Sequence, residues 1–298
     1  MASTDLTHTT VSSGNRGLWT FSFWVKRANL SVDQKIYSEW ASSNDFFALG
    51  FTGSDTLEFQ NKDNGSNNLV YITTAKFQDV SAWYHIVFAY DSSQASASDR
   101  FRVWINGVAE TNWGSSTLPA QGNTDIAISK GSSGTYNPRV GSYSGAYYNG
   151  YMAQMVKVDA QSLAASNFGS TDATTGEWKP KSDGEIRTAV TAGSGWGTTG
   201  WMLTFQDGSN LGYDYKTSDR SSNLDFTQAG SGYKTLDNPS DGQPSLNSEV
   251  YKPSGPTYTF SNANQGLSFS SSDWALIPGT IGPGDSGKWY FEAKQTSL

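Results

Sequence analysis

The alternation of large apolar and polar side chains constrains the fold of this chain more than any other feature. In the run "LWTFSFWVKR" (residues 18–27), Trp19, Phe21, Phe23 and Val25 fall on one side of an extended backbone. A period of two carried by aromatic and β-branched residues predicts a β-strand. Similar runs follow at short spacing, at residues 34–40, 45–51, 56–61 and 68–74. This spacing predicts an all-β protein, built as an antiparallel sandwich or barrel.

A longer run, "WYHIVFAYDSSQASASDRFRVWINGV" (residues 83–108), predicts two further strands and holds one of the two histidines. Asn106-Gly107 predicts a tight hairpin turn, because both residues tolerate the positive φ of a type I′ turn. His85 lies in the middle of the first strand, among aromatic neighbours. We interpret it as a packed or hydrogen-bonded structural residue and not as a catalyst.

Helical signals are weak in this sequence. Residues 162–169 ("SLAASNFG") contain the one convincing helical turn, whereas residues 124–130 ("TDIAISK") and 200–210 predict strands. Polar turns and four prolines indicate a linker or a wrapping segment in residues 211–256. A new β pattern begins at residue 257. The sequence thus predicts three parts, which are a domain over residues 1–210, the segment 211–256 and an incomplete β segment over residues 257–298.

Composition argues against several classes of protein. The 20 basic and 27 acidic residues leave a net charge of −7, so no nucleic-acid partner is expected. The chain has no cysteine, which excludes disulfides and thiol chemistry. No apolar run approaches the roughly 20 residues that span a bilayer, so no membrane insertion is expected. The first residues lack the basic and apolar regions of a signal peptide, and we expect synthesis in a cytoplasm.

Several of these runs resemble one known group of proteins. They are similar, in the same order, to laminin-G-like, concanavalin-A-like jelly-roll proteins of tailed bacteriophages, especially marine ones. The matching stretches are "WTFSFWVKR" (19–27), "AWYHIVFAYD" (82–91), "RVWINGV" (102–108), "DAQSLAASNFGSTDATTGEWKPK" (159–181) and "GWMLTFQD" (200–207). The resemblance covers about residues 10–225. In addition, "GTIGPGDSGKWYFEA" (279–293) resembles the opening of a SPRY domain.

The resemblance implies an antiparallel two-sheet jelly roll with a C-terminal β extension, in a virion structural protein. The relatives include tail fibres, receptor-binding proteins, head fibres and decoration proteins, so the implied location is the virion, after synthesis in the host cytoplasm. Implied partners are other virion proteins and a host surface glycan. Phage fibres are commonly trimers, so we expect a homo-oligomer, with residues 257–298 suited to exchange between chains.

Known catalytic motifs are missing from the sequence. Glycanases among the jelly-roll relatives carry E-x-D-x-x-E, which places two carboxylates on one face of a strand, and none of the seven glutamates begins that motif. Two histidines without cysteine leave too few ligands for a structural zinc site. The stretch "GPGDSGKW" (282–289) has the spacing of a phosphate-binding loop, but a strand pattern follows it in place of a helix. We therefore expect no enzyme.

Aromatic residues in or beside glycine-rich loops form a candidate sugar platform. Flat aromatic rings joined by a few polar groups are typical of sugar sites. The predicted ligand-binding residues are Trp113, Tyr136, Tyr143, Tyr147 and Tyr148. In the alternative interpretation these rings close one end of the sandwich or pack against a neighbouring subunit.

Calcium is the one cofactor to consider. Jelly-roll lectins often hold it with Asp and Asn oxygens from loops, and such hard ligands suit the ion. Aspartates at strand ends are the candidate ligands, namely Asp91, Asp99, Asp125 and Asp207. Aspartates in turns more often cap backbone amides, so we expect no cofactor, with calcium at these residues as the alternative.

Three functions remain open at this point. The first is a virion protein of fibre or receptor-binding type, whose lectin-like jelly roll contacts host surface glycan. The second is a capsid decoration or head-fibre protein that binds only neighbouring virion chains. The third is a polysaccharide-degrading enzyme, which the missing carboxylate motif disfavours.

Overall fold

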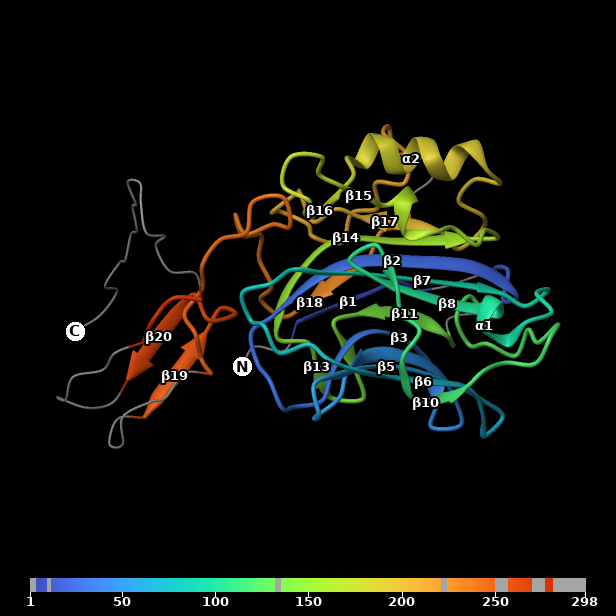
Figure 1. Cartoon of the computed structure of the whole chain (residues 1–298), viewed down its shortest axis with the longest axis horizontal. Helices are drawn as coiled ribbons and strands as arrows, with labels where there is room; N and C mark the ends of the chain where they lie inside the picture. The colour runs from blue at the N-terminus through green and yellow to red at the C-terminus, as the bar shows by residue number, and fades with distance from the viewer. Residues whose placement is uncertain are drawn as a thin grey trace.

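The computed structural model describes residues 4–9, 12–131, 135–220, 224–249, 257–269 and 277–280. Two antiparallel sheets lie face to face, so the two-sheet jelly roll expected from the sequence is confirmed (Figure 1). Eight strands form one sheet, in the order β10 (Trp113–Thr117), β6 (Ser66–Lys76), β5 (Thr56–Asp63), β4 (Asp45–Phe51), β3 (Gln34–Ser42), β11 (Asn137–Val140), β1 (Asp5–Thr7) and β18 (Thr227–Ala229). Six strands form the other, in the order β17 (Trp201–Leu203), β14 (Gly150–Asp159), β2 (Leu18–Arg27), β7 (Tyr84–Asp91), β8 (Phe101–Ile105) and β9 (Val108–Ala109).

The core between the two sheets is largely aromatic. The face of β2 predicted from its alternation is fully buried there. The ring of Phe21 stacks on Phe88 of β7 at 5.3 Å between centroids, and Trp19 meets Phe88 edge-on at 5.6 Å. Each such side chain contributes about 1.5–3 kcal/mol when removed from water. This aromatic layer therefore holds the two sheets together.

The outer face of the six-stranded sheet is covered by a second layer (Figure 1). That layer consists of η1 (Ala165–Asn167), the hairpin of β15 (Gly169–Thr171) and β16 (Trp178–Pro180), and α2 (Asp183–Ala192). Ile186 and Val190 of α2 are fully buried in a cluster with the outward-facing Val87 and Val156 of the sheet. The central strand β2 is consequently buried on both faces.

Helix α2 corrects the sequence analysis, which predicted a helical turn only at residues 162–169. That stretch contains η1, a single 3₁₀ turn, whereas α2 is ten residues long. Ser182 caps α2: its hydroxyl accepts from the Glu185 backbone amide at 3.3 Å, and its own amide donates to the Glu185 carboxylate at 2.9 Å. The S-x-x-E pattern of this capping box was the signal in the sequence.

Residues 126–129 are buried, but the stretch 124–130 does not form the predicted strand. Side chains of the eight-stranded sheet take up their backbone hydrogen bonds. The Ala127 amide donates to Asn61 Oδ1 at 2.6 Å, and the Ser129 amide donates to Glu39 Oε2 at 2.9 Å. Because buried backbone groups need partners of some kind, these side chains replace a neighbouring strand. The apolar pattern of the stretch thus indicated burial and not sheet pairing.

The chain beyond residue 210 contacts the sandwich in its described parts. Strand β18 joins the edge of the eight-stranded sheet, and Phe226 packs edge-on against Trp201 at 5.1 Å. A separate hairpin, β19 (Tyr258–Ser261) and β20 (Gly266–Phe269), stands at one end of the molecule (Figure 1). The division at residues 210 and 256 stays a prediction. Most of the SPRY-like stretch, from residue 281 onward, lies outside the described residues.

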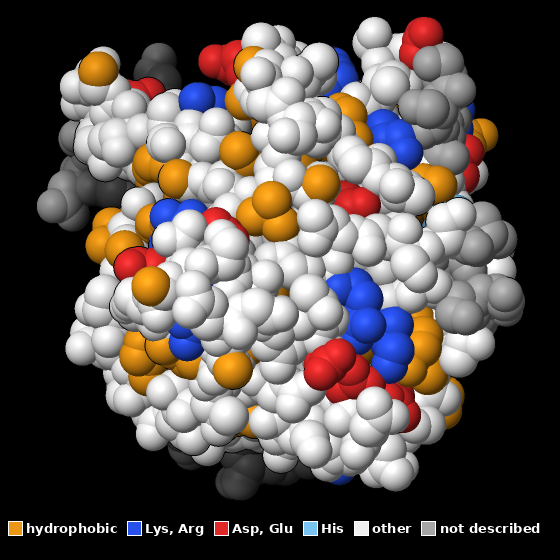
Figure 2. Space-filling view, turned by 90° about the vertical axis from the view of Figure 1, so that its right-hand side faces the viewer, with side chains coloured by type: hydrophobic (Ala, Val, Ile, Leu, Met, Phe, Trp, Pro, Cys, Tyr) orange, Lys and Arg blue, Asp and Glu red, His pale blue; other side chains and the backbone are white. Residues whose placement is uncertain are grey.

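Two short elements complete the described fold. They are α1 (Ala97–Arg100) and the hairpin of β12 (Ser142–Tyr143) and β13 (Ala146–Tyr147). No helix in the described ranges is long and apolar enough to cross a membrane. On the end of the molecule that bears α1, most side chains are uncharged, and the basic groups lie beside acidic ones (Figure 2).

The hairpin around His85 is part of the scaffold, as the sequence predicts. Asn106 and Gly107 both have positive φ, at 48° and 80°, and join β8 to β9 as a two-residue turn.

His85 is fully buried, and its ring stacks on Trp24 at 4.5 Å. Its Nδ1 accepts from Trp178 Nε1 at 2.8 Å, so the proton sits on Nε2 and is donated to Ser22 Oγ at 2.9 Å. Burial lowers the pKa of His85 to about 3.

This buried histidine predicts a pH-dependent stability. Below pH 6.5 His85 becomes protonated in the unfolded chain, whereas in the folded chain it stays neutral down to about pH 3. The free energy of unfolding therefore decreases as the pH falls from 6.5 to about 3. The slope is about 1.4 kcal/mol per pH unit. Urea denaturation at pH 6 and pH 4 should show the wild type losing about 2 kcal/mol more than His85→Gln, since His8 is common to both proteins. Equal losses would contradict the assignment of a neutral buried imidazole.

Candidate functional site

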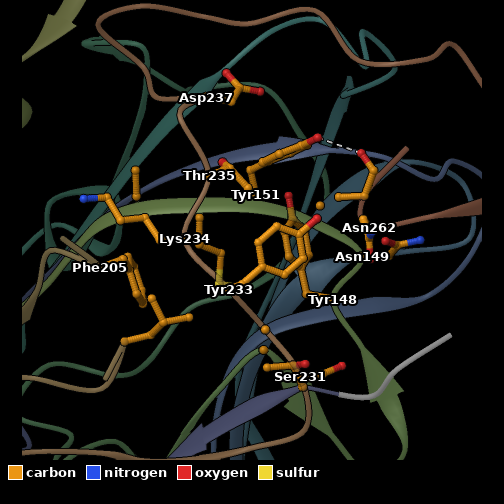
Figure 3. A pocket seen from close by; sticks show the side chains of 18 of the residues that line it. Tyr148, Asn149, Tyr151, Phe205, Ser231, Tyr233, Lys234, Thr235, Asp237 and Asn262 are labelled. Carbon is orange, nitrogen blue, oxygen red and sulfur yellow. Dashed lines mark hydrogen bonds between the residues drawn. The ribbon is translucent and has the colours of Figure 1, made fainter. Parts of the chain in front are cut away.

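A cavity of about 980 Å³ lies at the end of the sandwich that faces the β19–β20 hairpin. Its walls come from the ends of β1, β11 and β14, from the residues that follow β17, and from the segment 231–238. Figure 3 shows the side chains gathered there. Several parts of the chain that are distant in sequence therefore build one concavity, which is within the usual size range of a ligand site.

Figure 3 labels three of the four tyrosines that line this cavity, namely Tyr148, Tyr151 and Tyr233. The hydroxyl of Tyr148 donates to the Lys26 carbonyl at 2.8 Å, and that of Tyr151 donates to the Ala263 carbonyl at 2.7 Å. Tyr233 is 48% exposed. Burial raises the pKa of all three phenols, so they stay protonated and neutral at physiological pH. Such rings offer an apolar face and a hydroxyl together.

A buried ion pair holds one wall of the cavity in place. Lys26 Nζ lies 2.8 Å from Asp237 Oδ2, and both side chains are at most 1% exposed. The other oxygen of Asp237 accepts from Trp83 Nε1 at 3.0 Å and from the Gln243 amide at 2.9 Å. Lys26 Nζ also donates to the Gln243 carbonyl at 2.7 Å. These bonds anchor the segment 231–243 to β2.

The β19–β20 hairpin is attached through its turn. Asn264 is buried and donates its amide to the Ala28 carbonyl at 2.8 Å. Asn262, Ala263 and Asn264 all have positive φ, between 49° and 66°. Asparagine tolerates that conformation, whereas alanine is strained in it. The bond from Tyr151 to the Ala263 carbonyl stabilises the strained residue against the cavity wall.

Two buried hydroxyls that have no hydrogen-bond partner among the described residues also line the cavity. Thr204 Oγ1 and Tyr258 Oη are buried, and no described residue hydrogen-bonds to them. The side chains of Asn149 and Asn262 lie at the same wall (Figure 3). Buried hydroxyls usually have a partner in native proteins. A ligand that brings hydroxyl groups would supply partners for both.

The structure brings only one of the five aromatic residues predicted from sequence into this cavity, Tyr148. Tyr143 and Tyr147 lie on the β12–β13 hairpin, where Tyr143 packs on Phe46 at 5.2 Å and Tyr147 is 40% exposed. Tyr136 is buried, with Lys130 Nζ 4.7 Å from its ring centre. Trp113 packs edge-on against Tyr71 at the far edge of the eight-stranded sheet. Tyr143 and Tyr147 thus share one hairpin, but the five residues do not gather into one platform.

The four aspartates considered for calcium do not form one group of ligands in the described part of the chain. The Asp91 carboxylate accepts from Ser93 Oγ at 2.6 Å and from Gln94 Nε2 at 2.7 Å. Bonds from the Ser209 hydroxyl and amide lower the pKa of Asp207. Asp99 lies in α1, and the backbone amide of Asp125 donates to Asn123 Oδ1. In the described part of the chain no three His, Cys, Asp or Glu side chains gather to hold a metal ion. Calcium at these residues stays an untested alternative to the expectation of no cofactor.

Sequence reasoning missed most of the cavity. Tyr151 is the second residue of β14, and its position looked like any other in an alternating strand. Tyr233 and Asp237 fall in residues 211–256, whose lack of periodicity indicated a linker. The usable signal was an aromatic residue within that polar run, together with a buried lysine on β2 that needs an acidic partner.

Comparison with known proteins identifies a family for this chain. Residues 2–160, slightly more than half of the chain, match the sequence profile of the laminin-G type described as concanavalin A-like lectin/glucanases superfamily. The chain belongs to this superfamily. No curated protein matches it by sequence. This superfamily contains both lectins, which bind sugars, and glucanases, which cleave them. Whether a member binds or cleaves must therefore be argued from the side chains of its site.

Solved structures with a similar fold are remote in sequence. A pentraxin from Limulus polyphemus is 15% identical, with a TM-score of 0.37, over 55% of this chain and 72% of its own. Domain 4 of the arabinanase AbnA from Geobacillus stearothermophilus, solved with arabinotriose, is 17% identical, with a TM-score of 0.37, over 53% of this chain and 66% of its own. The CBM40 of the Ruminococcus gnavus sialidase, bound to sialyllactose, is 12% identical, with a TM-score of 0.35, over 50% of this chain and 86% of its own. At such scores these structures carry no argument about function.

Proposed function

We propose that this chain is a non-enzymatic virion protein of fibre or receptor-binding type, which binds a host surface glycan in the cavity between β14 and residues 231–238. One observation carries the glycan part: neutral phenol rings, amides and unpartnered hydroxyls converge in a single concavity. Sugars present both apolar ring faces and hydroxyls, which match that lining. Membership of the lectin/glucanase superfamily supports the same ligand class.

The acidic residues of the cavity favour binding over cleavage. Asp5 and Asp237 are the carboxylates among its lining residues. Asp237 is paired with Lys26, and Asp5 accepts from Ser142 Oγ at 2.9 Å and lies 3.7 Å from Arg139. Hydrolysis of a glycosidic bond requires one carboxyl to give a proton to the leaving oxygen while a second acts across the bond. Carboxylates already engaged by basic side chains are poorly suited to those roles.

The virion part of the proposal comes from the sequence resemblance to phage proteins. A trimer with several copies of a weak site would gain avidity for a repetitive glycan. The alternative of a decoration or head-fibre protein has one observation in its favour. Leu236 is 85% exposed next to the half-exposed Tyr233, and exposed apolar side chains of this kind often contact other proteins.

Tyr233→Ala should weaken glycan binding about tenfold, because one aromatic contact is worth roughly 1.5 kcal/mol. The measurement is retention on an array of bacterial surface polysaccharides, with the chain length of a retained polysaccharide checked after incubation. Tyr147→Ala is the matched control, since this tyrosine is similarly exposed but lies outside the cavity. Loss of binding in Tyr147→Ala alone would contradict this and indicate that the glycan binds at the β12–β13 hairpin instead. Shortened polysaccharide would establish an enzyme instead.

Immunogold labelling of purified phage particles tests the virion part. Antibody raised against residues 12–220 should label the tail periphery if the protein recognises the host. Label spread over the capsid would support the decoration alternative. Particles of the encoding phage that carry no label would overturn the assignment to a virion.

A further inference from the structure

A second pocket, of about 560 Å³, lies on the outer face of the six-stranded sheet beside the β15–β16 hairpin. Three tryptophans line it, namely Trp24 of β2, Trp83 just before β7, and Trp178 of β16. Trp24 lies opposite His85 in the strand register. Period two places Trp83 on the same face of its strand as His85. We call this concavity the tryptophan pocket.

The three indole rings are held rigidly. Trp24 stacks on His85 with an interplanar angle of 18°, and Trp178 donates to the same imidazole. A side chain at Gly107 or Gly169 would collide with the Trp178 ring, so that ring is clamped between two backbone segments. Trp83 is fixed by its bond to Asp237. A pocket with fixed aromatic walls loses little entropy when a ligand binds.

One polar group in this pocket has no partner. Trp24 is 2% exposed, and no described residue accepts a hydrogen bond from its Nε1. The corresponding groups of Trp83 and Trp178 both have acceptors. A buried N–H without an acceptor is unfavourable, so a ligand in this pocket should bring an oxygen that accepts. A quaternary ammonium, the usual guest of an aromatic cage, brings no acceptor.

We propose that the tryptophan pocket is a second carbohydrate site, which takes a pyranose ring against its indole faces, with Trp24 Nε1 donating a hydrogen bond to a sugar oxygen. This inference rests on the proposed glycan-binding function and adds a second point of contact to it. Asn106 and Glu177 at the rim supply the few polar groups that orient such a ligand.

The two sites share a wall. Asp237 and Asn238 line the tyrosine-lined cavity, whereas Pro239 and Gly242 line the tryptophan pocket. Trp83 joins them, because it lines the pocket and donates to Asp237. Two adjoining subsites would raise the affinity for a glycan chain above that for a single sugar.

The test uses the full chain with ¹⁵N-labelled tryptophan, whose eleven indole N–H signals are followed by NMR. The probes are the methyl glycosides of glucose, galactose, mannose and N-acetylglucosamine, titrated in turn. Trp24→Phe keeps a ring but removes the donor, and the signal missing from its spectrum assigns Trp24. Ala82→Phe fills the pocket from its lining without replacing any of the three tryptophans. Trp113, at the far edge of the other sheet, is the internal control.

At least one glycoside should shift the Trp24 and Trp83 signals saturably and leave Trp113 unmoved. Trp24→Phe should bind it about tenfold more weakly, as expected for one lost hydrogen bond, and Ala82→Phe should not bind it. Tyr233→Ala should leave these shifts intact while weakening polysaccharide retention about tenfold. If the Trp24 signal shifts but Tyr233→Ala retains polysaccharide as well as the wild type, the tryptophan pocket is supported as a carbohydrate site and the cavity lined by Tyr233 is contradicted as one. Static Trp24 signals with all four probes, or shifts that survive in Ala82→Phe, would overturn the second site.

Discussion

The ion pair between Lys26 and Asp237 is the interaction on which both candidate sites depend. It joins the central strand of the six-stranded sheet to a segment more than 200 residues later in the chain. Removing one partner of such a buried pair leaves a charge without compensation, at a cost of about 3–5 kcal/mol. That is a large share of the stability of an ordinary domain. The wall between the cavity and the tryptophan pocket is therefore well anchored, even though it carries no regular secondary structure.

Burial of β2 on both faces explains how a sandwich acquires these sites. Its inner face forms the aromatic core, which fixes the position of the strand. Its outer face presents Ser22, Trp24 and Lys26. Ser22 and Trp24 contact His85 of the neighbouring strand β7, and Lys26 pairs with Asp237. Because polar groups on a covered face need partners, this layer is held by directed bonds as well as by apolar contact. The tryptophan pocket lies between the six-stranded sheet and its covering layer, at a place where the two do not pack fully against each other.

Much of the fold could be predicted from the sequence, whereas the candidate site could not. The alternation in residues 18–27 and the Asn106-Gly107 turn are local properties, and both are confirmed. Residues 124–130 were predicted wrongly because distant side chains, Asn61 and Glu39, replace a strand partner there. The cavity joins tyrosines from three separate segments, and their proximity follows from topology and not from spacing. Pairing of Lys26 with Asp237 is equally non-local.

A crystal structure of the chain with an oligosaccharide cut from a polysaccharide that it retains would test the central claim most directly. The account predicts intact sugar rings in the cavity, against Tyr151 and Tyr233, with sugar hydroxyls bonded to Thr204 Oγ1 and Tyr258 Oη. An oligosaccharide bound only at the β12–β13 hairpin, or found cleaved in the crystal, would contradict it.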